Sequence, residues 1–140
     1  MNLLAVGKQR FRLIITKRDK PYLVSVVDTL DLDEELTTKT TQSGYYLRHY
    51  VEQYLDILSE ATKIEFEIGE LPHDPIRLAH IAATILQSPP ELKQSLLSIE
   101  TSGHLLTALI QTYRFELPLL KSMLVPQSPD NGQSGPFSLN

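Results

Sequence analysis

The spacing of apolar residues changes once along this chain, and the change divides it into a β part and a helical part. Between residues 11 and 16 apolar and polar residues alternate, which places Phe11, Leu13 and Ile15 on one predicted face. From Tyr45 onward apolar residues recur every three or four positions. Because a period of two is typical of strands and a period of 3.6 is typical of helices, we expect an α+β fold with the strands first.

The β part is predicted to be a short antiparallel meander. A turn at Gly7 and Lys8 follows the first apolar run, and a charged segment ending at Pro21 supplies the second turn. Ile14 interrupts the alternation of the second run. Three short strands cannot cover their own apolar face, so this part needs a second layer. The predicted strands span residues 2–6, 11–16 and 22–27.

An acidic and then threonine-rich segment, residues 28–44, joins the two parts. Its composition indicates a solvated strand end followed by a mobile loop. Its carboxylates raise the possibility of a calcium site, but the EF-hand spacing with its glycine and closing glutamate is missing. We therefore expect no metal ion there.

About four helices are predicted in the second part, the first of them over residues 45–60. Residues 63–69 alternate and are predicted to be extended, while the Pro/Gly/Ser-rich residues 125–140 are predicted to be a disordered tail. Pro118 lies inside the last helix and should kink it. The starts of the last three helices are predicted from Asp74 before Pro75, from a capping box at Ser88 and Glu91, and from Thr101 or Ser102.

The sequence lacks the groups that catalysis or cofactor binding usually requires. It has no cysteine, its six glycines form no phosphate-binding loop, and its four histidines have no further ligands at zinc spacing. A triad of Ser43, His49 and Asp56 would lack the strained turn that presents a nucleophilic serine. We expect no catalytic residue, no metal and no cofactor, and hence no enzyme.

Charge and hydropathy restrict the partners and the location. The net charge of −4 offers no basic field for nucleic acid. No apolar run approaches the roughly 20 residues of a membrane span. The short apolar run at the N-terminus is followed at once by charged residues, unlike a signal peptide. We expect a soluble cytoplasmic protein with no membrane partner.

Basic and aromatic residues come together once, at Lys8, Arg10, Phe11 and Arg12. Such a cluster can neutralise and stack on a nucleic acid strand. The alternative is that the arginines face water from an open strand while Phe11 packs inward. Tyr22, on the next predicted strand, is a further candidate for contact with a partner.

Three tyrosines, Tyr46, Tyr50 and Tyr54, follow one another at intervals of four residues on the first predicted helix. Such a stripe belongs either to the core or to an interface at the edge of the core. We keep Tyr46 and Tyr50 as candidate contact residues.

Several short motifs follow one another along the chain: Gly7, Gln9-Arg10-Phe11-Arg12, Pro21-Tyr22-Leu23, Asp74-Pro75, Leu78-Ala79 and Lys93-Gln94. In the order and spacing of these motifs, the chain resembles the N-terminal, substrate-binding domain of the Lon protease over roughly residues 1–124. The resemblance implies a partial PUA-like β subdomain (residues 1–40) and a helical subdomain (residues 41–124). The chain would lack the ATPase domain, the Ser-Lys protease domain and the first strands of the β subdomain.

The resemblance implies a non-catalytic module that recognises unfolded or extended polypeptide and can deliver it to a separate protease. Gly103-His104 and Pro118 depart from the family pattern. Two other readings stay open: RNA binding through the PUA-like part, and a truncated remnant with no function of its own. Because the open β edge is a template for another strand, we expect the chain to form a homodimer through that edge, to bind an extended peptide there, or to aggregate. The candidate contact residues are Arg10, Phe11, Arg12, Tyr22, Tyr46 and Tyr50.

Overall fold

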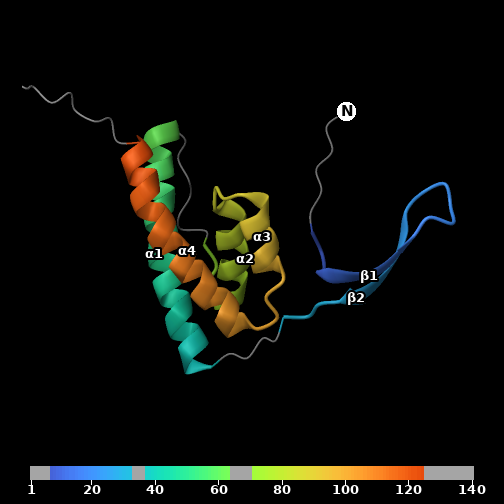
Figure 1. Ribbon diagram of the computed structural model, residues 1–140. Coiled ribbons are helices and arrows are strands. Elements are labelled where there is room, and N and C mark those ends of the chain that lie inside the picture. Colours follow the sequence, from blue (N-terminus) through green and yellow to red (C-terminus); the bar gives the residue numbers. More distant parts are fainter. Residues whose placement is uncertain (1–6, 33–36, 64–70, 125–140) are drawn as a thin grey trace, which may run out of the picture.

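A computed structural model describes residues 7–32, 37–63 and 71–124 of the chain (Figure 1). It contains one antiparallel sheet followed by helices, which confirms the α+β class. The strand predicted over residues 2–6, most of the extended segment 63–69 and the tail 125–140 lie outside the described residues. The elements are β1 (Phe11–Lys17), β2 (Val24–Thr29), α1 (Thr38–Thr62), α2 (Pro75–Ile85), α3 (Pro90–Leu97) and α4 (Ser102–Leu124).

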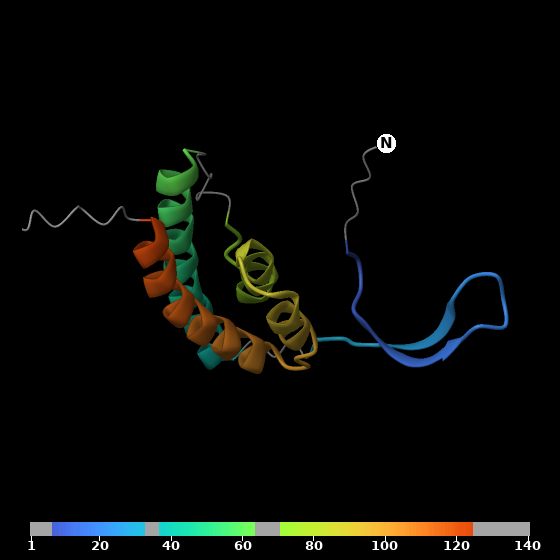
Figure 2. The same cartoon turned by 45° about the horizontal axis from the view of Figure 1, so that its top comes forward.

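The helices form a unit built around α1 and α4, which lie side by side and run in the same direction (Figures 1 and 2). Each turns an apolar stripe at helical spacing toward the other. The α2 helix packs against both of them. The buried core is made of Leu47, Val51, Tyr54, Leu55, Leu71, Leu78, Ala79, Ala82, Leu86, Leu96, Leu105, Leu106, Leu109, Tyr113 and Leu117.

Two buried tyrosines contact each other at the centre of this core. The rings of Tyr54 and Tyr113 meet edge to face, with centroids 5.2 Å apart. The Tyr113 hydroxyl donates a hydrogen bond to the Ala82 carbonyl (2.8 Å), and the Gln87 N–H donates to the Tyr54 hydroxyl (3.0 Å). The hydroxyls are therefore satisfied, and α1, α2 and α4 are joined at one point.

The α1 helix begins at Thr38, so the prediction of a loop up to residue 44 is wrong. Thr37 and Thr40 form a capping box, in which each side chain accepts the other residue's backbone N–H (3.2 and 2.8 Å). At Gly44, an added Cβ would lie 2.5 Å from the Cβ of Pro75. The cap and the close approach to α2 stabilise two turns whose threonines are poor helix formers.

The remaining helices begin where the sequence predicts, but one of them lacks the predicted cap. Asp74 caps α2 by accepting the N–H groups of Ile76 and Arg77. The α3 helix is not capped by Ser88: its N-cap is Pro89, and the buried Ser88 hydroxyl has no partner among the described residues. The α4 helix continues through Pro118 to Leu124 and is curved in Figure 2.

The two strands form a hairpin with a bulge at Ile14. Leu13 lies opposite Val27 and Ile15 lies opposite Val26, so Ile14 has no partner of its own. Because Val26 and Val27 point to opposite faces of the sheet, Leu13 and Ile15 do so as well. The prediction of a single apolar face is therefore wrong, and the interruption noted at Ile14 is its cause.

Candidate functional site

The β1–β2 hairpin extends away from the helices (Figures 1 and 2). Its apolar side chains are exposed on both faces: Leu13 and Leu23, for example, are 60% and 67% exposed. A contiguous group of large apolar side chains at the surface usually marks a contact site for another macromolecule. The hairpin surface consists of Phe11, Leu13, Ile14, Ile15, Tyr22, Leu23, Val26 and Val27.

Among the described residues, the hairpin also leaves backbone groups unpaired along its two edges. In the described part of the chain the sheet contains only β1 and β2. Each strand therefore has one edge at which no further described strand pairs, and its outward N–H and C=O groups can accept another strand. Apolar side chains and free edges together suit an extended polypeptide segment.

Two of the candidate arginines attach the hairpin to the helical unit. Arg10 donates from Nη1 to the carbonyl oxygens of Leu97 (2.9 Å), the last residue of α3, and of Ile99 (2.7 Å). Arg12 forms an ion pair with Glu100 (2.7 Å), in which both side chains are exposed. Both guanidinium groups are thus engaged with the protein's own oxygens. Two of the three cations in the basic cluster, Arg10 and Arg12, therefore contact the protein's own oxygens, and of these two only Arg12 forms an ion pair with a described residue.

The aromatic candidates fall into two places. Phe11 and Tyr22 belong to the hairpin surface, and the Lys20 ammonium lies 5.8 Å from the centre of the Tyr22 ring. Tyr46 and Tyr50 lie on α1, where Tyr46 is exposed and Tyr50 is half-buried against the core. The structure therefore does not bring the six candidate residues into one site.

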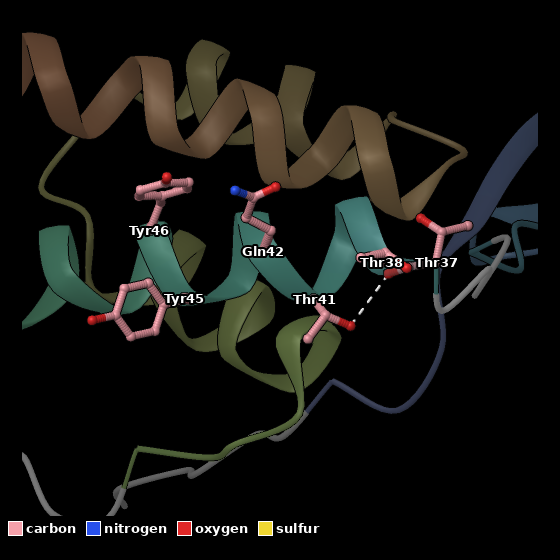
Figure 3. A pocket seen from close by; sticks show the side chains of 6 residues that line it. All are labelled: Thr37, Thr38, Thr41, Gln42, Tyr45 and Tyr46. Atoms are coloured by element: carbon pink, nitrogen blue, oxygen red, sulfur yellow. Dashed lines mark hydrogen bonds between the residues drawn. The ribbon is translucent and has the colours of Figure 1, made fainter.

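A shallow pocket lined by threonine, glutamine and tyrosine side chains lies on the first turns of α1 (Figure 3). Gln42 and Tyr46 point to one side of the helix and Tyr45 points away from them (Figure 3). The Thr41 hydroxyl donates to the Thr37 carbonyl (3.2 Å). This pocket was not predicted from the sequence, because the capping-box signature has Glu or Gln three residues after the cap, where this chain has Thr40.

The described residues offer neither a cluster of metal ligands nor a membrane-spanning helix. No group of three or more His, Asp or Glu side chains in the described ranges is placed to hold a metal ion. Within the same ranges, no helix is both long enough and apolar enough to cross a membrane.

These features define a small α+β domain whose candidate sites are open surfaces suited to a macromolecule. Residues 1–111 match the family model of the ATP-dependent protease La (LON) substrate-binding domain. The chain belongs to this family, as its short motifs indicated. The matched model is that of the substrate-binding domain, which supports a role in substrate recognition. No curated protein and no solved structure matches the chain.

Proposed function

We propose that this protein binds unfolded or extended polypeptide and that the hairpin surface holds it. The observation that carries the proposal is the exposure of apolar side chains on both faces of a two-stranded sheet. A client strand that pairs with a free edge gains backbone hydrogen bonds, and its alternate side chains cover the apolar groups on each face. Such binding depends on extended conformation more than on sequence, as recognition of many clients requires.

A binding measurement with paired variants tests the proposal. The probe is a fluorescently labelled, permanently unfolded polypeptide, and its anisotropy gives the Kd. Leu13→Thr and Val27→Thr change an opposed pair on one face of the sheet and keep good strand formers. The control is Phe115→Gln, because Phe115 is 69% exposed but lies on α4.

We expect the double hairpin variant to weaken binding at least tenfold and the control variant to leave the Kd unchanged. Equal losses in the two variants would show that the hairpin is not the site. An absence of binding by the unaltered protein would favour the remnant reading. The Kd should change little with salt, whereas binding of RNA would weaken steeply as the salt concentration rises.

The free edges also lead us to propose a homodimer that competes with the client. Two hairpins that pair edge to edge would form a four-stranded sheet and would occupy the same backbone groups. Sedimentation at micromolar concentrations should therefore show a dimer that dissociates as polypeptide is added. A monomer at all concentrations would contradict this part of the proposal.

Delivery of the bound client to a separate protease is the last part of the proposal. The family match to a protease's substrate-binding domain supports it. Added in excess, the protein should change the rate at which a cytoplasmic ATP-dependent protease degrades the unfolded probe. The double hairpin variant should not change this rate.

A further inference from the structure

The charges of this chain are divided unevenly between the hairpin and the rest of the molecule. Residues 7–30 hold six of the thirteen lysines and arginines of the chain but two of its seventeen aspartates and glutamates. This part therefore carries a formal charge of +4, although the whole chain carries −4. A local excess of one sign of charge selects partners, because it attracts groups of the opposite sign and repels groups of the same sign.

At the base of the hairpin, next to the helices, the cations are balanced by the protein itself. Arg10 donates to two backbone carbonyl groups, and Arg12 forms an ion pair with Glu100. Asp28 lies directly opposite Arg12 in the register of the two strands. Two arginines and two carboxylates thus stand together at this end. Most of the positive excess lies elsewhere on the hairpin.

The excess is concentrated at the turn between β1 and β2, the end of the hairpin farthest from the helices (Figures 1 and 2). We call Lys17, Arg18, Asp19 and Lys20 the hairpin tip, and all four residues are exposed. Within the described ranges, neither Lys17 nor Arg18 forms an ion pair. The Lys20 ammonium lies over the ring of Tyr22. The tip therefore presents three cations and one carboxylate to the solvent.

This charge lies at one end of the hairpin surface, because Tyr22 and Leu23 directly follow the tip in the chain. A client strand as long as β1 has seven residues and extends about 23 Å. The Debye length at physiological ionic strength is about 8 Å. The tip can therefore attract client residues at the near end of such a strand and has little effect on those at the far end.

We propose that the preferred clients of the hairpin surface are polypeptides in which acidic residues follow or precede an apolar segment. The cations Lys17, Arg18 and Lys20 contact the client's carboxylates, while the hairpin surface covers the apolar segment. This inference rests on the proposed binding of extended polypeptide by the hairpin. Exposed ion pairs are weak, so the tip should strengthen binding by about fivefold. Its second effect is to determine which end of the client lies at the tip.

A comparison of three peptides with the full chain tests the charge preference. The peptides share one extended apolar segment and differ in three residues at one end, which are all glutamate, all glutamine or all lysine. Fluorescence anisotropy gives the three Kd values. At low salt the glutamate peptide should bind about fivefold more tightly than the glutamine peptide, and the lysine peptide more weakly than either. These differences should shrink as salt is added, while the Kd of the glutamine peptide should change little.

A matched pair of variants tests whether the preference arises at the tip. Replacing the tip cations, with Lys17→Gln, Arg18→Gln and Lys20→Gln together, should make the three Kd values equal. The Kd of the glutamine peptide should not change, which shows that the variant still folds and binds. The control removes the same number of charges from exposed positions on the helices and should keep the preference. Its substitutions are Lys39→Gln, Arg77→Gln and Lys121→Gln.

The outcomes separate this inference from the proposed function. Equal Kd values for the three peptides with the unaltered protein would overturn the charge preference and leave polypeptide binding intact. A preference that persists in the tip variant, or that is lost in the control, would do the same. If none of the peptides binds, the proposed function fails and this inference fails with it. Single-stranded RNA that displaces the glutamate peptide and binds more tightly would make the tip a nucleic-acid contact and would also overturn the inference.

Discussion

The hydroxyl groups of Tyr54 and Tyr113 are the polar centre of an otherwise apolar core. Both rings are almost fully buried, and each hydroxyl is hydrogen-bonded to the backbone of α2 or of the residues just after it. Burial raises the pKa of Tyr113 well above the usual value of 10, and that of Tyr54 also rises, because desolvation penalises the phenolate. The burial of these two side chains therefore affects both the free energy of unfolding and its dependence on pH.

Tyr113→Phe removes the hydroxyl that donates to the Ala82 carbonyl. That carbonyl also accepts the Leu86 N–H (3.2 Å), so it keeps one partner. We expect the free energy of unfolding to fall by about 1 kcal/mol in a urea titration at pH 7. The exposed Tyr45→Phe should change it by less than about 0.5 kcal/mol. An equal effect of the two substitutions would mean that the buried bond contributes nothing.

The raised tyrosine pKa values also predict alkaline unfolding. The folded protein holds the phenolic protons more tightly than the unfolded chain, so their contribution is fully present below pH 10. As the pH rises above 10, this stability is lost. The free energy of unfolding of the wild-type protein should therefore fall progressively from about pH 10 upward. Tyr113→Phe should reduce the fall, and an identical slope in both proteins would contradict the assignment.

Arg10 holds the hairpin to the helices through two carbonyl groups at the end of α3. Replacing it with glutamine removes both charge-assisted hydrogen bonds, whereas Arg18→Gln changes a charge in the turn between the strands. Hydrogen exchange of β1 and β2 should become at least tenfold faster in Arg10→Gln. Exchange in α1 and α4 should not change. Faster exchange throughout the protein would mean that the hairpin stabilises the helical core.

At the scale of elements, close approach between α1 and α2 determines how the helical unit packs. The contact occurs where Gly44 faces Pro75, the first residue of α2. A short segment of the chain thus serves both as a helix cap and as a packing surface. This tertiary contact explains why helix propensity underestimates the length of α1.

Gly44→Ala should disrupt that contact. Its Cβ would lie 2.5 Å from Pro75 Cβ and 3.2 Å from Pro75 Cα, so the helices must move apart. We expect a loss of about 1–3 kcal/mol in unfolding free energy, measured by urea denaturation. Gly103→Ala is the matched control, because its added methyl group meets open space. It should leave the stability unchanged or raise it by about 0.5 kcal/mol. A stable Gly44→Ala protein would contradict the packing described.

Local signals in the sequence predicted much of this arrangement. The change of period gave the fold class, and Asp74 with Pro75 gave the start of α2, because a cap is encoded within four residues. The bulge reversed the predicted face of Ile15, since one extra residue moves every later side chain to the other face.

The candidate site was predicted only in part. Phe11 and Tyr22 are exposed as a binding role requires. The partners of Arg10 and Arg12 lie 87 to 89 positions away, and single-sequence patterns carry no information about such pairs. The groove between the first turns of α1 and α4 was missed for the same reason, because it depends on the packing of α1 beside α4.

At the scale of the whole molecule, a stable helical unit supports a hairpin with little cover of its own. The core lies entirely within the helical unit, while the hairpin's apolar side chains are exposed. A two-stranded sheet is marginally stable in water without a packing partner. We therefore expect the hairpin to become ordered when it binds a client strand.

Hydrogen exchange with and without an unfolded polypeptide tests this account most directly. Backbone pairing with a client should slow the exchange of amides on the strand edge that it covers, within residues 11–17 or 24–29. Exchange in α1, α2 and α4 should remain as in the free protein. If polypeptide binds but slows exchange only in the helices, the hairpin is not the recognition surface and the account is wrong.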